Sequence, residues 1–272
     1  MPVTRNRILI CVGLVCLFAA GIPLAAQEPN LTPQEMEDFL LHAKVIASKG
    51  ASKGITGVVR LTLSDGKITH NAAFQAFDET KAKMEFADGN VEMNFRDTYH
   101  YDIAAYELSK MLGLDHMIPV HVARKWEGRT GALSWWVPWK WDEEMRLKIG
   151  IKPPDLDAWN RQMHRMRVFT QLVYDIDRNL GNVLITEDWK LYMIDFSRAF
   201  RRYNDLLQPK DLEKCDQQLF QKMKELKADE VLARTKPHLS KAEVVPLIQR
   251  RDKIVAVFEK LAKEKGESEV FY

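Results

Sequence analysis

Three polar side chains near the middle of the chain have the types and the spacing that phosphoryl transfer needs. Asp177 and Asn182 open and close the segment Asp-Arg-Asn-Leu-Gly-Asn, and Asp195 follows the apolar run that ends at Ile194. Phosphoryl transfer needs a carboxylate that orients or deprotonates the accepting hydroxyl, and ligands for a divalent cation that neutralises the phosphates. Mg²⁺ prefers oxygen ligands, which one carboxylate and one amide can supply. We therefore expect Asp177 to be catalytic, and Asn182 and Asp195 to hold Mg²⁺ or Mn²⁺.

The same segment also has a purely conformational interpretation. Asp, Asn and Gly favour turns, and Asp195 after an apolar strand can simply cap the next turn. The order of the surrounding elements favours the chemical interpretation, because a helix, a loop, a strand pair and an Asp follow one another. Asp175 is a competing base, but its spacing to Asn182 does not fit. Arg178 is expected to anchor the loop or to neutralise phosphate.

Apolar spacing indicates the elements that must position these residues. From Trp159 to Val173 an apolar side chain recurs every three or four residues, which predicts a buried helix leading into Asp177. The runs 183–186 and 190–194 predict a hairpin with Asn182 and Asp195 at its ends. Further elements are expected as helices at 32–43 and 97–112, strands at 58–63, 67–77, 118–124 and 131–137, a connector at 142–157, and helices after Pro209 with a capping box at Ser240 and Glu243.

This order predicts an α+β chain in which a small antiparallel sheet with one helix precedes a mostly helical half, and it lacks the β-α alternation of a parallel sheet. The expected divisions are a signal peptide at 1–26, a helical extension at 27–48, a first lobe at 49–141 and a second lobe at 142–272. Gly54, Thr56 and Gly57 lie between two strands and could cover a triphosphate with backbone amides, although a glycine-containing hairpin explains them as well. Trp136 precedes the connector, where it could contact an adenine or belong to the core.

The first residues indicate export. Arg5 and Arg7 precede the apolar run 8–24. Ala25 and Ala26 supply the small residues that are typical of a signal-peptide cleavage site. The run is also long enough to compete as an uncleaved anchor. In both cases the rest of the chain is expected beyond the membrane, in the periplasm, the medium or a secretory lumen. Contact with a membrane is expected only if the segment stays uncleaved.

Composition excludes several classes of function. Without Arg5 and Arg7, the remaining basic residues equal the 38 acidic ones, so the charge gives no reason to expect nucleic-acid binding. Arg198, Arg201 and Arg202 form a local basic patch that could dock a phosphate or serve as ion-pair partners. Paired Cys or His residues at zinc-ligand spacing are missing. Cys215 has no partner in the mature chain and is expected to be an ordinary helix residue.

The motif residues give the chain a resemblance to a known group. It resembles the atypical kinases that include phosphatidylinositol 3- and 4-kinases, HipA-like kinases and secretory-pathway kinases of the Golgi casein-kinase type, and looks most like a bacterial exported branch. The resemblance spans about residues 50–200 and is carried by Asp177-x-x-x-x-Asn182 and Ile194-Asp195-Phe196. It implies a two-lobed protein-kinase-like fold, ATP or another nucleoside triphosphate as phosphate donor, and the roles given above to Asp177, Asn182 and Asp195.

Two departures from that group concern the nucleotide. Where the resemblance implies a phosphate-binding Lys in the third strand, the chain has the neutral Gln75; Lys81 or Lys83 are possible substitutes. The helix Glu that would pair with such a Lys corresponds to Asp102, unless Glu107 fills the role. Gln75, Lys83, Asp102 and Trp136 thus join Gly54, Thr56 and Gly57 as candidate nucleotide-binding residues.

Three functions remain open on the sequence. The first is an exported kinase-like phosphotransferase that acts on an unidentified hydroxyl of a protein, a sugar or a lipid. The second, suggested by Gln75, is a pseudokinase that binds a nucleotide or a partner without turnover. The third is a structural exported domain in which the polar cluster only shapes a turn.

Overall fold

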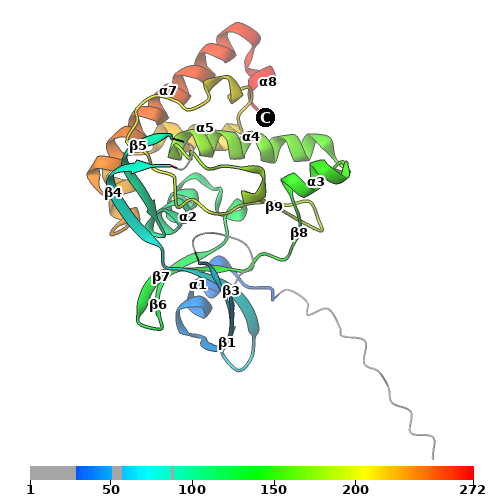
Figure 1. Ribbon diagram of the computed structural model, residues 1–272. Helices are drawn as coiled ribbons and strands as arrows, with labels where there is room; N and C mark the ends of the chain where they lie inside the picture. Colours follow the sequence, from blue (N-terminus) through cyan, green and yellow to red (C-terminus); the bar gives the residue numbers. More distant parts are fainter. Residues whose placement is uncertain (1–28, 51–56, 87–88) are drawn as a thin grey trace, which may run out of the picture. The chain divides into compact units, whose positions relative to one another are not determined.

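Antiparallel strands build the first part of the computed structural model, which describes residues 29–50, 57–86 and 89–272 (Figure 1). Five of them form one sheet in the order β1-β2-β3-β7-β6 within this described part. Residues 31–272 make one compact unit, and the expected signal peptide, 1–26, lies outside the described residues. The sheet strands are β1 Lys44–Gly50, β2 Val59–Ser64, β3 Thr69–Gln75, β6 His121–Trp126 and β7 Arg129–Trp135.

The expected hairpin between β2 and β3 is confirmed. Its turn is closed by Asp65, whose Oδ1 accepts hydrogen bonds from the N–H groups of Lys67 and Ile68, both at 2.8 Å. Alternate side chains of the two strands, including Leu61, Leu63 and Phe74, are buried. The alternation therefore gives the sheet one core-facing side.

Helix α1 (Pro33–His42) covers part of this sheet. A capping box between Thr32 and Glu35 starts it, as the sequence indicates. Phe39 and Leu40 are buried, and the ring of Phe39 meets that of Trp135 on β7 edge-on at 5.6 Å between centroids. The extension expected at 27–48 thus carries this helix, but its last residues belong to β1, which pairs with β2.

A second hairpin, made of β4 (Asp78–Glu85) and β5 (Val91–Thr98), is absent from the sequence-based expectations. Because β5 runs to Thr98, helix α2 spans His100–Leu112 and begins later than expected. Gly113 ends α2 in the left-handed conformation, with φ of 71°. The two strands pair only with each other among the strands that the structure describes.

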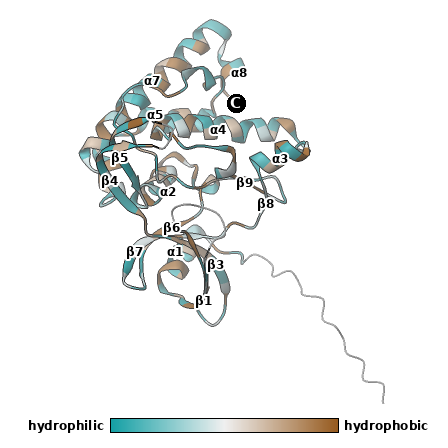
Figure 2. Ribbon diagram, viewed as in Figure 1, coloured by the Kyte–Doolittle hydropathy of each residue, from teal (hydrophilic) through white to brown (hydrophobic). Residues whose placement is uncertain are grey.

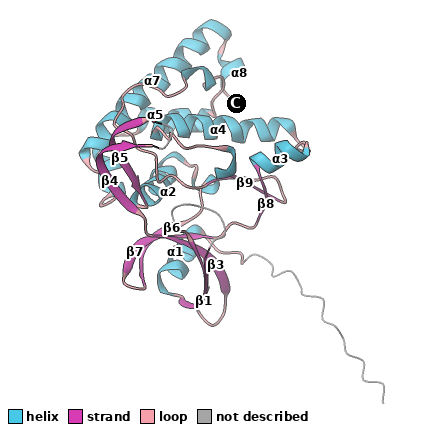
Figure 3. Cartoon of the chain, in the orientation of Figure 1, coloured by secondary structure: helices cyan, strands magenta, loops and turns pink. Residues whose placement is uncertain are grey.

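The second half is mostly helical, as Figure 3 shows. Helix α4 (Leu156–Val173) buries the expected apolar stripe, including Trp159, Met166 and Phe169. Beyond it come β9 (Val183–Thr186) and β10 (Leu191–Met193), the predicted hairpin, with β8 (Trp139–Asp142) paired to β9. The expected connector contains a helix, α3 (Glu143–Ile149), which Asp142 caps.

The last long helix, α7 (Lys241–Lys265), packs against α4. Helix α7 starts at the predicted capping box of Ser240 and Glu243, and hydrophilic and hydrophobic residues alternate along it, as expected for a helix with one buried face (Figure 2). The remaining elements are η1 Asp115–Met117, η2 Leu180–Asn182, η3 Pro209–Asp211, α5 Gln217–Glu225, α6 Ala228–Thr235, α7 Lys241–Lys265 and α8 Glu267–Val270. Within the described residues, no helix combines the length and apolar character that crossing a membrane requires.

Candidate functional site

The loop between α4 and β9 presents Asp177 to solvent. Tyr174 adopts a left-handed conformation, with φ of 49°, and ends α4 just before the loop. Asp175 is 1 % exposed, and its Oδ1 accepts the N–H of Asp177 at 3.1 Å. The buried carboxylate of Asp175 thus supports the loop, while Asp177 is exposed and its Oδ1 accepts a bond from Asn179 Nδ2 at 3.3 Å.

Asn182 joins this loop to the strand end that bears Asp195. Its side-chain Nδ2 donates to the backbone oxygen of Asp177 at 3.1 Å, and its backbone oxygen accepts the N–H of Ile194 at 3.1 Å. The first bond fixes the orientation of the amide and leaves its Oδ1 as an available acceptor. The side-chain amide of Asn182 is therefore fixed to the Asp177 loop, while its backbone pairs with the Asp195 segment.

Arg178 binds the two segments together. Its Nη1 donates to the backbone oxygens of Asn182 at 2.9 Å and Ile194 at 2.5 Å, and its Nη2 lies 2.5 Å from Asp175 Oδ2. The guanidinium also lies over the ring of Phe196, 4.3 Å from its centroid. The ion pair is almost completely buried, so Arg178 anchors the loop, one of the two roles expected for it.

Asp195 has a backbone conformation that is uncommon outside glycine. Its φ is 58°, in the left-handed region that Asp and Asn tolerate better than most residues. On its far side, Asp102 Oδ1 accepts the N–H of Phe196 at 2.7 Å. The residues on either side of Asp195 are thus both fixed, Ile194 by Arg178 and Phe196 by Asp102.

Carboxylates gather around Asp195. Burial raises the pKa of Asp102 well above its usual range, and the charge of Asp195 raises it further. The pKa of Asp97 is also raised, mainly by burial, while a side-chain hydrogen bond with Ser197 opposes and Asp195 adds to the effect. Asp102 Oδ2 and Asp97 Oδ1 are buried without a hydrogen-bond partner. A cation bound nearby would favour the charged forms of these buried carboxylates and could use their unpaired oxygens.

The donor set is incomplete for a metal held by protein alone. No cluster of three or more His, Cys, Asp or Glu side chains in the described residues could hold an ion. Mg²⁺ and Mn²⁺ in phosphoryl-transfer sites commonly take only one or two protein ligands and complete their shells with phosphate and water. Asp195 and the amide of Asn182 fit that pattern.

The candidate nucleotide residues do not all meet at this site. Gly54 and Thr56 lie outside the described residues, and Gly57 has φ of 65° with open space around it. Trp136 follows β7, and the guanidinium of Arg60 lies 4.4 Å from its ring centroid. Lys83 is 51 % exposed on β4 and pairs with Glu85 on the same strand. No described contact joins Lys83 to the Asp195 segment.

Gln75 ends β3 in a crowded position. It is 9 % exposed, and its backbone oxygen lies 2.3 Å from where a Cβ on residue 131 would be, so that Gly131 allows the close approach of β7. Its neutral amide leaves the Lys position of the resemblance without a charge. Asp102, the expected ion-pair partner, binds a backbone N–H instead.

A hollow of about 420 Å³ opens beside Asp177. Most of its lining residues are polar or charged, although their apolar atoms make up more than half of the lining surface, and they come from the end of α4, the loop and the segment before α5. The residues are Met166, Arg167, Thr170, Gln171, Asp175, Ile176, Asp177, Arg178, Asn179, Leu207, Gln208 and Asp211. A larger hollow, between α1 and the β2–β3 turn, contains none of the candidate catalytic or metal-binding residues.

The sequence does not predict which acidic residues pair with the arginines that follow Asp195. Arg198 and Arg201 both pair with Glu92 on β5, and Arg202 pairs with Glu243 on α7. The basic patch is therefore made of ion-pair partners, one of the two alternatives considered above. The turn signal Asp88-Gly89 could have revealed the hairpin that carries Glu92.

Comparison with known proteins places the fold. No protein-family model and no curated protein sequence matches the chain. A solved structure of hydra Fam20 with sugar matches over 90 % of this chain and 93 % of its own, with TM-score 0.65 and 15 % identity. The Golgi casein kinase with Mn/ADP bound matches over 88 % and 78 %, with TM-score 0.60 and 12 % identity. The Helicobacter pylori proinflammatory kinase CtkA matches over 83 % and 98 %, with TM-score 0.50 and 12 % identity.

These likenesses confirm the two-lobed kinase-like fold and the resemblance to atypical kinase-like proteins. At such low identities they show the fold alone. The chemistry of the site must therefore be inferred from its own residues.

Proposed function

We propose that the chain is a kinase-like phosphotransferase that moves a phosphoryl group from a nucleoside triphosphate to a hydroxyl. The observation that carries this proposal is the bond between Asn182 and Ile194, 3.1 Å from oxygen to nitrogen, which joins the Asp177 loop to the Asp195 segment. The carboxylate of Asp195 and the amide oxygen of Asn182, one from each segment, are the kinds of ligand that one divalent cation takes. The Golgi casein kinase, whose structure contains Mn/ADP, supports the choice of a nucleotide and Mn²⁺.

Each residue has a role in the proposed reaction. Asp177 accepts the proton of the acceptor hydroxyl as its oxygen bonds to the terminal phosphorus, and the bond from that phosphorus to the bridging oxygen breaks to release a nucleoside diphosphate. Asp195 and Asn182 would hold Mg²⁺ or Mn²⁺, which supplies positive charge to the phosphate oxygens. Arg178 keeps both segments in position.

The hollow beside Asp177 is the proposed place of the acceptor. Its volume of about 420 Å³ lies within the range of small-ligand sites, and amides, a hydroxyl and charged groups line it. Hydra Fam20 was solved with sugar, and polar side chains of the hollow such as those of Thr170, Gln171 and Gln208 could bond sugar hydroxyls. Protein and lipid hydroxyls remain alternatives. We further propose that residues 1–26 direct export.

A transfer assay tests the proposal. The mature chain is incubated with labelled ATP, Mn²⁺ and candidate acceptors, and Asp195→Asn is compared with the wild type. We expect at least about a hundredfold loss, in the range seen when a transition-state contact is removed. Asp188→Asn is the matched control, because Asp188 lies on the exposed β9–β10 turn and pairs with Lys190. Equal transfer by Asp195→Asn and wild type refutes the site.

A pseudokinase is the second candidate, and it rests on one observation. Gln75 is neutral and Asp102 is bound to the Phe196 N–H, so the described residues contain no Lys–acid pair at these positions. A protein of this kind is stabilised by nucleotide and Mn²⁺ by about RT ln(1 + [L]/Kd) but transfers no phosphate. A thermal shift without transfer favours it, and no shift with any nucleotide counts against both candidates.

A further inference from the structure

The β4–β5 hairpin contacts the chain just after Asp195. Glu92 on β5 is the centre of these contacts: its Oε2 lies 2.5 Å from Arg198 Nη2, and its Oε1 pairs with Arg201 Nη2. The side chain of Glu92 is 18 % exposed, and those of Arg198 and Arg201 are 16 % and 6 % exposed. One carboxylate therefore bridges two largely buried arginines of the same turn.

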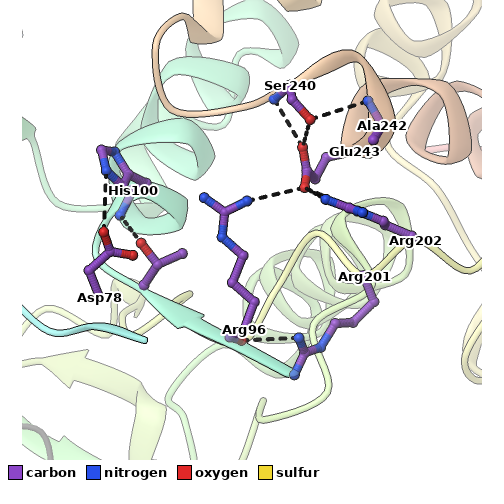
Figure 4. Close-up of polar contacts among 9 residues, drawn as sticks. Asp78, Arg96, His100, Arg201, Arg202, Ser240, Ala242 and Glu243 are labelled. Atoms are coloured by element: carbon purple, nitrogen blue, oxygen red, sulfur yellow. Dashed lines mark hydrogen bonds and ion pairs between the residues drawn. The ribbon is translucent and has the colours of Figure 1, made fainter. Parts of the chain in front are cut away.

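Other bonds fix the same turn to the hairpin. Ser197 accepts the N–H of Thr98 on its backbone oxygen at 3.1 Å. Arg201 Nη1 donates to the backbone oxygen of Arg96 at 3.0 Å, as Figure 4 shows. The guanidinium of Arg198 lies over the ring of Phe95, 4.7 Å from its centroid. Residues 197, 198 and 201 are thus all held by β5.

The hairpin itself is anchored to the helical half. Arg96 Nη1 lies 3.2 Å from Glu243 Oε1 on α7, and Arg202 Nη2 lies 2.8 Å from the same oxygen (Figure 4). Glu243 is completely buried and belongs to the capping box that starts α7. The hairpin therefore has a fixed base from which Glu92 can hold the turn.

We infer that Glu92 is a positioning residue that keeps Asp195 in its metal-binding orientation by fixing the turn 197–201. This inference rests on the proposed function. The bridge acts through Arg198 and Arg201.

Two measurements on Glu92→Gln test the inference, with Glu85→Gln as the matched control. Glu85 lies on β4 of the same hairpin, is 67 % exposed and pairs with Lys83, away from the Arg198 turn. We expect Glu92→Gln to speed amide hydrogen exchange in residues 195–201 by at least tenfold, and to raise the Mn²⁺ concentration for half-maximal transfer by a similar factor. Glu85→Gln should change neither. A purely stabilising ion pair would leave the Mn²⁺ requirement unchanged.

The two measurements separate the inference from the proposed function. If the wild type transfers no phosphate, the proposed function fails, and hydrogen exchange alone decides whether Glu92 holds the turn. Unchanged exchange in folded Glu92→Gln overturns the inference, as does faster exchange with an unchanged Mn²⁺ requirement in an active enzyme. Should Glu92→Gln not fold, Glu92→Asp keeps the charge but shortens the reach, and the same measurements on it decide.

Discussion

The carboxylate of Asp102 on α2 accepts the backbone N–H of Phe196, with 2.7 Å between Oδ1 and nitrogen. The bond makes α2 a support for the residue after Asp195. The other oxygen of Asp102, Oδ2, is buried and has no hydrogen-bond partner. Asp102, which was expected to form an ion pair, therefore binds a backbone N–H with one oxygen. Its second oxygen remains able to accept a hydrogen bond.

This bond predicts different outcomes for two substitutions of Asp102. Asp102→Ala leaves the Phe196 N–H buried and unpaired, which should lower the free energy of unfolding by about 1–3 kcal/mol. Asp102→Asn keeps an oxygen as acceptor for this N–H and replaces a carboxyl group whose charged form burial disfavours, so its stability should stay within about 1 kcal/mol of wild type. Urea unfolding at pH 7 measures both, and equal losses for the two variants would contradict the assignment of the bond.

Arg178 and Asp175 should show strong coupling in a double-mutant cycle. Their ion pair is 2.5 Å long and almost inaccessible to water, so Arg178→Met leaves the carboxylate of Asp175 buried without its partner. The loss expected for breaking such a pair is about 3–5 kcal/mol. Asp175→Asn and the double variant complete the cycle, with an expected coupling of about 1–3 kcal/mol.

The double variant should remain less stable than wild type, because Arg178 also donates to the backbone oxygens of Asn182 and Ile194. Chemical unfolding of all four proteins gives the coupling. A value near zero would mean that the buried pair does not organise the loop.

Gly131 should not tolerate a methyl group. A Cβ there would lie 2.3 Å from the backbone oxygen of Gln75 and 2.9 Å from the ring of Phe74, so β3 and β7 would have to separate. Gly131→Ala should cost about 1–3 kcal/mol, as overpacking commonly does. Gly50→Ala is the control, since nothing lies within 4 Å of its Cβ position. Thermal unfolding distinguishes them, and similar melting temperatures would show that the strands are not in close contact.

Local sequence signals are sufficient for the elements next to the site. The stripe of α4 is predictable because its apolar residues recur at fixed spacing, and the β9–β10 hairpin because two short apolar runs flank a turn. The capping boxes of α1 and α7 are equally local. Such signals are enough to place Asp177 after a helix and Asp195 at a strand end.

Apart from the turn signal Asp88-Gly89, no local pattern predicts the β4–β5 hairpin. Its strands are rich in charged residues, and β4 is mostly exposed, so no apolar alternation marks it. It is held by long-range ion pairs, above all those of Glu92 with Arg198 and Arg201, which sequence spacing does not reveal. Sequence spacing also does not reveal the partner of Lys83. The sequence suggests Lys83 as a substitute for the phosphate-binding Lys, whereas in the structure it pairs with Glu85 on an exposed strand.

The contact between His100 and His238 predicts a loss of stability in mild acid. The two Nδ1 atoms lie 2.9 Å apart, so one ring must donate and the other must accept, which requires at least one neutral ring. Burial, and then the charge of His100, lowers the pKa of His238 to about 4. Burial also lowers the pKa of His100, while Asp78, 3.9 Å away, opposes this effect and Arg96 adds to it (Figure 4).

Because the folded pKa values lie below the unfolded value near 6.5, the unfolded chain binds more protons between about pH 6.5 and 4, and stability falls as the pH falls through this range. From His238 alone, with 1.4 kcal/mol for each pKa unit, about 2 kcal/mol should be lost between pH 7.5 and 5. Urea unfolding across this range measures the slope. His238→Gln should flatten it, whereas His42→Gln, at the exposed end of α1, should not. An unchanged slope in His238→Gln would show that this ring does not stay neutral when the protein folds.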